Sequence, residues 1–111
     1  MSVRERVSAI GSAMLSGDPS PADARKHEIT LSGLLSHINK AVTGAEVAYK
    51  RRLAVIRMGV ETAAEAKMQA EATQEFADWA EAKATKESAL EMLRTLRSAL
   101  RSQTEEMRMA R

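Results

Sequence analysis

Arginines recur at regular intervals near the C-terminal end of the sequence, within the run MLRTLRSALRSQTEEMRMA at residues 92–110. The repeated residues are Arg94, Arg97, Arg101 and Arg108, which alternate with Leu93, Leu96 and Leu100. Guanidinium groups gathered on one surface would bind phosphates or acidic protein side chains. The alternative is an ordinary helix end, where arginines complement the helix dipole and cover apolar surface with their stems. The choice depends on the charges that the fold places opposite these arginines.

A first helix over residues 1–16 is predicted from apolar residues that recur at helical spacing. They are Val3, Val7, Ile10 and Met14. Gly17 suits the end of this helix. Ser20 followed by Pro21 is typical of a helix start, because serine caps a helix and proline is tolerated at its first position.

The second helix is predicted over residues 21–58, where one apolar stripe continues for about seven turns. The stripe consists of Leu31, Leu35, Ile38, Val42, Ala45, Tyr49, Leu53 and Ile56. Gly33 and Gly44 lie inside this helix, where glycine is unfavourable compared with alanine. We therefore expect a soft kink or a close contact with another helix at either glycine.

The break between the second and third helices is predicted at Gly59, which suits a left-handed helix end. Thr62, with Glu65 three residues later, is a capping box for the next helix. The third helix is predicted as one uninterrupted element over residues 62–110, because this stretch contains neither Gly nor Pro. Its apolar seam consists of Met68, Ala72, Phe76, Trp79, Leu90, Leu93, Leu96, Leu100 and Met107.

A helix this long with one narrow apolar stripe must lie against another helix to be stable. The sequence therefore predicts an all-α, coiled-coil-like fold. In this fold two long helices form an antiparallel hairpin hinged at Gly59, and the short first helix lies beside the open end. At 111 residues the chain is expected to form a single domain over residues 1–111.

Charge is segregated along the chain, although the total of 17 Lys and Arg against 15 Asp and Glu is nearly neutral. Residues 41–60 carry four basic side chains against one acidic, residues 61–92 carry three against eight, and residues 93–111 carry five against two. In a hairpin hinged at Gly59 the basic run at residues 50–57 meets the acidic start of the third helix. Its Lys and Arg are therefore expected to find partners within the chain.

The arginines near the C-terminal end face the start of the second helix, where the predicted hairpin offers no acidic stretch to neutralise them. The predicted binding site for nucleic acid or an acidic partner therefore consists of Arg25, Lys26, Arg94, Arg97, Arg101 and Arg108. Exposed aromatic residues are not interleaved with these side chains, so base stacking is not expected. Any contact with nucleic acid would involve the phosphate backbone and would depend strongly on salt.

Residues typical of catalysis are scarce. The sequence has no cysteine, which excludes disulfides, thiolate metal sites and cysteine nucleophiles. His27 and His37 lie ten residues apart and lack carboxylates at the spacing of a metal site or a catalytic base. Glycine-rich phosphate loops and nucleophile motifs are missing as well. We therefore expect no enzyme activity, cofactor, metal or small-molecule substrate.

The start of the sequence, MSVRERVSAIGSAML, is too short and too charged for a membrane span. It also lacks the cleavage pattern of a secretory signal. We therefore expect a cytoplasmic protein with no membrane partner.

Self-association, with a dimer as the favoured form, is predicted from the apolar seam of the third helix. Two or three thin helices would leave part of this seam uncovered, and long exposed apolar stripes are uncommon on monomers. The residues expected at the contact between copies are Met68, Phe76, Trp79, Leu93, Leu96 and Leu100.

Residues 45–111 contain a basic helix with a tyrosine, AEVAYKRRLAVIR, and then a glycine-led break with a threonine cap, GVET. An Ala/Glu/Trp helix and a Leu/Arg/Ser stretch follow, AAEAKMQAEATQEFADWAEAKATKESALEMLRTLRSALRSQTEEMRMAR. This pattern resembles small helical proteins encoded by tailed bacteriophages and prophages, often beside genes for single-strand annealing or recombination functions. The resemblance implies an accessory protein in the bacterial host cell that works on DNA or on a protein that handles DNA. It implies no catalytic residue.

Two functions remain open at this point. In the first, the protein is an accessory factor of phage DNA recombination or replication that presents its arginines to DNA or to a DNA-bound protein. In the second, it binds proteins only, as an inhibitor of a host nuclease or defence complex or as a virion assembly factor. Phosphate contacts must weaken as salt rises, so the salt dependence of DNA binding separates the two.

Overall fold

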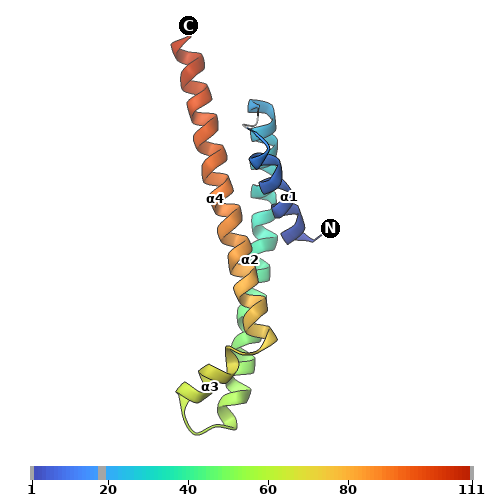
Figure 1. The fold of residues 1–111 in the computed structure, drawn as a ribbon, viewed down its shortest axis with the longest axis vertical. Coiled ribbons are helices and arrows are strands. Elements are labelled where there is room, and N and C mark those ends of the chain that lie inside the picture. The colour runs from blue at the N-terminus through green and yellow to red at the C-terminus, as the bar shows by residue number, and fades with distance from the viewer. Residues whose placement is uncertain (1, 18–19, 111) are drawn as a thin grey trace. The chain divides into compact units, whose positions relative to one another are not determined.

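The computed structural model describes residues 2–17 and 20–110. Over these residues the chain forms α1 (Val3–Leu15), α2 (Pro21–Met58), α3 (Ala63–Ala70) and α4 (Gln74–Met109), which Figure 1 shows as ribbons. Neither of the two described stretches contains a β-strand. The predicted all-α class is therefore confirmed.

Contacts between residues divide the chain into two compact units. Unit 1 consists of the chain up to His37 together with the chain from Glu87 onward, and unit 2 consists of residues Ile38–Lys86. Helices α2 and α4 each contribute one part to unit 1 and the other part to unit 2. Each unit has its own core, whereas the sequence predicts one continuous apolar seam along the hairpin.

Unit 1 contains α1, the first part of α2 and the last part of α4. Its buried apolar residues are Val7, Ile10, Ala24, Leu31, Leu34, Ala89, Leu93 and Leu96. Leu31 and Leu96 are both 0% exposed. Burial of Val7 and Ile10 confirms the helical face predicted for α1 and shows that α1 packs against the rest of unit 1.

Helix α1 approaches α4 closely at Gly11. A Cβ atom at this position would lie 2.9 Å from Cε of Met92, which is too close for two carbon atoms. The obstructing atom is the end of a flexible side chain, so the methionine can shift if a larger residue replaces the glycine. Glycine thus permits the close packing of α1 on α4 in unit 1.

Capping residues define the ends of α1 and the start of α2. The Ser2 hydroxyl accepts a hydrogen bond from the backbone N–H of Glu5 at 3.1 Å. The Ser20 hydroxyl accepts one from the backbone N–H of Asp23 at 3.2 Å, which is the cap predicted for α2. Gly17 follows α1 with a φ of +150°, a backbone conformation that residues other than glycine rarely adopt.

The core of unit 2 is built around three aromatic rings. The buried Tyr49 ring of α2 lies 5.0 Å from the Trp79 ring and 5.4 Å from the Phe76 ring, both on α4. The Trp79 and Phe76 rings meet edge to face at 6.4 Å. Lys83 Nζ lies 3.7 Å from the centroid of the Trp79 ring, a cation–π contact. All the aromatic residues of the chain therefore pack in unit 2.

The third predicted helix is broken, so the expectation of one uninterrupted element over residues 62–110 is wrong. Helix α3 ends at Ala70 and α4 begins at Gln74. Between them the Thr73 hydroxyl donates to the Ala70 carbonyl at 2.6 Å and accepts from the Phe76 N–H at 3.4 Å. The Thr73 side chain therefore ends α3 and caps α4. Its hydrogen bonds to the backbone compete with those that a continuous helix would form.

Helix α3 packs through small side chains. Ala66 is 1% exposed and Ala70 is 0% exposed, whereas Met68 is 73% exposed. The predicted seam through Met68 and Ala72 is therefore wrong for this segment, since Ala72 is also exposed. The break at Thr73 gives α3 its own orientation, and alanine side chains let its backbone come close to the rest of unit 2.

The close helix contact predicted for the glycines of α2 is also wrong. Over its described length α2 is one helix from Pro21 to Met58. No neighbouring atom lies within 4 Å of the place where a Cβ would stand at Gly33 or Gly44, so neither glycine marks a close helix contact. Gly59 does not have the positive φ predicted for it.

The turn after α2 is closed by hydrogen bonds instead. The Gly59 N–H donates to the Ile56 carbonyl at 3.0 Å, and the Arg57 guanidinium donates to the Val60 carbonyl at 2.8 Å. The first bond satisfies a carbonyl group in the last turn of α2 and the second holds the residues that follow it, so a left-handed glycine is not required. The Thr62 hydroxyl accepts from the Glu65 N–H at 3.1 Å, which confirms the predicted cap at the start of α3.

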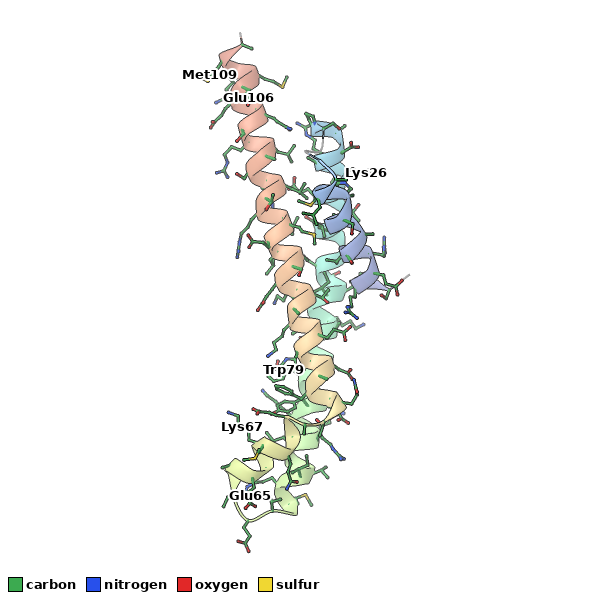
Figure 2. All side chains as sticks on the ribbon, in the orientation of Figure 1. Lys26, Glu65, Lys67, Trp79, Glu106 and Met109 are labelled. Carbon is green, nitrogen blue, oxygen red and sulfur yellow. The ribbon has the colours of Figure 1, made fainter. Side chains whose placement is uncertain are left out.

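Helices α2 and α4 pack against each other within each unit, which confirms the helical hairpin. In unit 1, Arg97 of α4 reaches Glu28 of α2. In unit 2, Trp79 of α4 stacks on Tyr49 of α2. Figure 2 shows the side chains that fill the spaces between these helices. Across residues 2–17 and 20–110, no helix combines the length and the apolar composition that a membrane span requires.

Candidate anion-binding surface

Four arginines occupy one face of α4 in unit 1. Arg94, Arg97, Arg101 and Arg108 are separated by three, four and seven residues. At about 100° per residue, these steps place all of them within about 60° of one another around the helix axis. All four are exposed. We call this set the arginine face.

The core side of α4 positions the arginine face. Leu93 and Leu96 are buried between α4 and the other helices of unit 1, at 1% and 0% exposure. Arg94 and Arg97 each directly follow one of these leucines, so burial of the leucines directs the two arginines to the edge of the helix interface. The spacing of the arginines along α4 therefore accounts for their common face.

Two of these arginines have acidic partners, which corrects the prediction that the fold does not neutralise them. Arg97 Nε lies 3.3 Å from Glu28 Oε1 on α2. Arg94 Nη1 lies 3.1 Å from Glu91 Oε2, three residues earlier on α4. Both arginine side chains stay more than half exposed, so each ion pair is weak and readily exchanged.

Arg101 and Arg108 form the part of the arginine face without such partners. Neither makes a salt bridge with any residue in the described part of the chain. Glu105 lies four residues after Arg101 and three before Arg108, a spacing that permits pairing on a helix, yet the structure contains no such pair. These two guanidinium groups are open to solvent.

Arg25 lies beside the arginine face, whereas Lys26 does not. A hollow of about 480 Å³ is lined by Arg25, Glu28, Ile29, Ser32 and Leu100. Because Glu28 is the partner of Arg97, this hollow places Arg25 next to the arginine face. Lys26 leaves α2 about 100° further around the helix, and Figure 2 labels it on the side of α2 away from α4.

The surface is basic only locally. Unit 1 contains nine Lys and Arg against eight Asp and Glu, a formal charge of +1. All the aromatic residues belong to unit 2, so the arginine face has no ring on which a base could stack. An anion held here would therefore be bound through its phosphate or carboxylate groups alone.

The basic run of α2 does not pair with the acidic start of the third predicted helix. Lys50 pairs instead with Glu46 on its own helix at 3.0 Å. Arg57 donates to the Val60 carbonyl in the turn after α2. Within the part of the chain that the structure describes, no salt bridge joins this run to the acidic residues of 61–75. A pair one turn apart on a helix forms without any tertiary contact, and here one such pair forms instead of the predicted ones.

The residues predicted for self-association fall into three groups by their burial. Leu93 and Leu96 belong to the core of unit 1, so their assignment to a contact between copies is corrected. Leu100, Phe76 and Trp79 are half-buried, and Met68 is largely exposed. Sequence periodicity identifies the apolar face of a helix but not the helix that covers it. The same apolar pattern is required whether the covering helix belongs to the same chain or to another copy.

The structure brings no metal-binding cluster together in the stretches that it describes: His, Asp and Glu side chains do not gather there in groups of three. His27 is half-buried and His37 is exposed.

The arginine face and the hollow beside it are thus the features of unit 1 suited to an anionic partner. The resemblance to phage accessory proteins stays a prediction from residues 45–111. Comparison of the chain with protein-family models, with curated proteins and with solved structures finds no match.

Proposed function

We propose that this protein is a non-enzymatic phage accessory factor in the cytoplasm of the bacterial host. It acts in DNA recombination or replication by binding DNA or a DNA-handling protein through the arginine face. The observation that carries the proposal is the exposure of all four arginines on one face of α4, with Arg101 and Arg108 unpaired among the described residues.

Arginine suits such a surface because its planar guanidinium donates parallel hydrogen bonds to phosphate or carboxylate oxygens. The weak pairs of Arg94 and Arg97 can be exchanged for an incoming anion, since both side chains are more than half exposed. With four phosphate contacts, affinity for double-stranded DNA is expected to fall by about a hundredfold between 50 and 200 mM salt. Contacts of this kind carry no base sequence preference.

The test replaces Arg94, Arg97 and Arg101 with Gln in one variant. Glutamine forms helices nearly as well as arginine, so α4 is expected to remain intact. Gel shifts with single- and double-stranded DNA at rising salt should show binding by the native chain and much weaker binding by this variant. The slope of log affinity against log salt should also become shallower by about three for duplex DNA.

A matched control replaces Lys40, Arg51 and Arg52 of unit 2 with Gln, which removes the same charge from another part of the chain. This control should bind DNA as the native chain does. Equal loss of binding in both variants would show that net charge matters and the arginine face does not. Circular dichroism of each variant confirms that its helices remain formed.

A second function, binding to proteins only, is favoured by exposed methionines. Met58 and Met68 of unit 2 are 87% and 73% exposed, and Met109 of unit 1 is 88% exposed. Methionine adapts to irregular apolar partners, and the near-neutral charge of unit 1 suits a protein better than a long polyanion. Failure of the native chain to bind DNA at low salt would favour this function, as an inhibitor of a host nuclease or defence complex or as a virion assembly factor.

We also propose that the protein forms a dimer through the exposed apolar residues of unit 2, with Met68 at the contact. Light scattering at micromolar concentration should return twice the 12.1 kDa mass of one chain. Replacing Met68 with Glu should return a single-chain mass, because a charge would be buried without a partner. Replacing Leu15, which is 89% exposed in unit 1, with Glu is the control and should leave the dimer unchanged. A single-chain mass for the native protein would contradict the proposal.

A further inference from the structure

A second hollow lies wholly within unit 2 and is independent of the arginine face. Its volume is about 520 Å³. It is lined by Tyr49, Lys50, Leu53, Ala54 and Arg57 of α2 and by Ala63, Ala66 and Lys67 of α3. A volume of this size falls within the range that small-molecule sites occupy in proteins.

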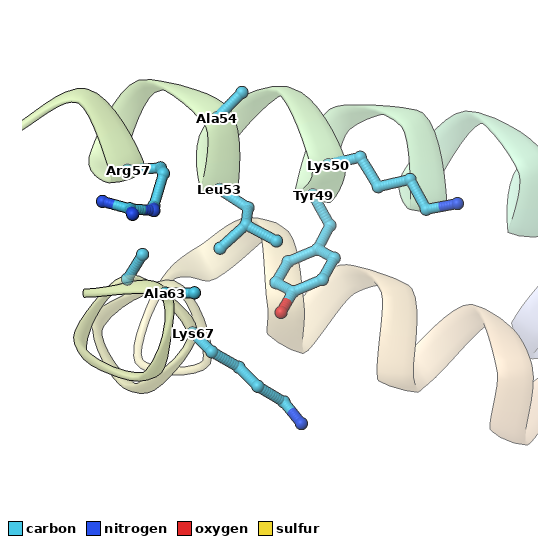
Figure 3. Close-up of a pocket in the computed structure, with 8 residues that line it drawn as sticks. Tyr49, Lys50, Leu53, Ala54, Arg57, Ala63 and Lys67 are labelled. Carbon is cyan, nitrogen blue, oxygen red and sulfur yellow. The ribbon is translucent and has the colours of Figure 1, made fainter.

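The lining of this hollow combines an apolar wall with positive charge. Figure 3 shows the Tyr49 ring and the Leu53 side chain pointing from α2 toward the side on which α3 lies. Alanines of α2 and α3 complete the apolar part. Lys50, Arg57 and Lys67 are the charged residues of the lining, and no acidic side chain is among its residues.

The three cationic side chains of the lining differ in whether they already bind a partner within the chain. Lys50 pairs with Glu46 at 3.0 Å, and Arg57 donates to the Val60 carbonyl at 2.8 Å. Lys67 is exposed and has no ion pair with any residue of the described stretches. Lys67 is therefore the cation that is free to bind a ligand.

Tyr49 supplies a second polar group at the same place. Its side chain is buried, with 7% of the residue exposed, yet its hydroxyl forms no hydrogen bond within the part of the chain that the structure describes. The hydroxyl oxygen itself is not fully buried, so water can reach it and a ligand in the hollow can take the place of that water. The hydroxyl and the Lys67 ammonium are both available as donors on one hollow.

We propose that this hollow binds a small amphipathic carboxylate, an aliphatic chain or ring that ends in a carboxylate group. The apolar part of the ligand lies against Leu53, the Tyr49 ring and the alanines. The carboxylate accepts hydrogen bonds from the Tyr49 hydroxyl and the Lys67 ammonium. A neutral ligand would leave Lys67 without a counter-ion, and a wholly polar anion would leave the apolar wall exposed.

Octanoate is the probe, measured by isothermal titration calorimetry on the full chain. Saturable binding with a Kd of about 0.1 to 1 mM is expected for an anion with this number of atoms. Octanol, which has the same chain without the charge, should bind at least about tenfold more weakly. Amide shifts in a two-dimensional NMR spectrum should be centred on residues 49–57 and 63–67.

Two variants test the roles of the polar groups. Lys67→Gln removes the charge at an exposed position, and Tyr49→Phe removes the hydroxyl but keeps the ring. Each should weaken octanoate binding by about tenfold or more, since each removes a hydrogen bond to a charged group. Lys40→Gln makes the same change as the first variant at an exposed position of α2 outside the hollow, and it should bind octanoate as the native chain does.

The proposal is overturned if octanoate gives no saturable heat, if octanol binds as tightly, or if Lys67→Gln and Lys40→Gln bind equally well. Lys67 is exposed, so its substitution tests the site even if Tyr49→Phe proves unstable. The arginine-face variant should bind octanoate normally, because its substitutions lie in unit 1. The arginine-face variant tests DNA binding and the Lys67 variant tests octanoate binding, so failure of one proposal can be distinguished from failure of the other.

Discussion

Replacing Leu96 with Ala is expected to lower the free energy of unfolding by about 3 kcal/mol, within the usual range of 2 to 5 for a buried leucine. Leu96 is 0% exposed in the core of unit 1, where α4 meets the other helices. Alanine removes the apolar contacts of the side chain and leaves a cavity that the surrounding helices fill only in part. Thermal or urea unfolding followed by circular dichroism measures the change.

The control is Leu15→Ala, the same chemical change at a residue of α1 that is 89% exposed. Leucine and alanine both favour helices, so this variant should differ from the native chain by less than about 0.5 kcal/mol. The comparison isolates burial from helix propensity. Equal losses at Leu15 and Leu96 would show that the core assigned to unit 1 does not form in solution.

Replacing Tyr49 with Ala should have an effect of similar or larger size in unit 2, about 3 to 5 kcal/mol. The ring of Tyr49 is the one that contacts both Phe76 and Trp79, at 5.4 and 5.0 Å. Its removal takes away buried apolar area and two aromatic contacts, each worth about 0.5 to 1.5 kcal/mol beyond that area. Since the whole stability of a domain is about 5 to 15 kcal/mol, this loss is a large share of it.

Trp79 is the only tryptophan, so its fluorescence and near-ultraviolet circular dichroism report on this core. Both signals should change in Tyr49→Ala as the ring loses its stacking partner. Tyr49→Phe keeps the ring, so it should retain the signals and most of the stability. A native Trp79 signal in Tyr49→Ala would contradict the aromatic core.

Local signals in the sequence predict the helices well. The start of α2 at Pro21 follows from Ser20, whose hydroxyl reaches the N–H of Asp23, three residues later. The cap at Thr62 has the same origin. Hydrogen bonds and side-chain contacts within one helical turn involve neighbours in the sequence, so residue types at those positions are sufficient to predict them.

The break at Thr73 shows where such signals become ambiguous. Thr73 followed by Gln74 and Glu75 carries a cap residue, but the surrounding alanines and glutamates favour a continuous helix equally well. In the structure, the break accompanies burial of Ala66 in α3 and stacking of Trp79 on the buried Tyr49 ring in unit 2. Tertiary packing decides between two local conformations of similar energy.

The sequence by itself determined the helical class, the positions of the hairpin turn and of α2, and the spacing that puts four arginines on one face of α4. Tertiary structure alone decided which charges far apart in the sequence meet. Glu28 and Arg97 are 69 residues apart, and their pairing requires α2 and α4 to pack in one register. The hollow at Tyr49 and Lys67 also depends on tertiary packing, because its walls come from α2 and α3. Periodicity specifies which face of a helix is apolar, whereas the partner of that face is set by the packing of the whole chain.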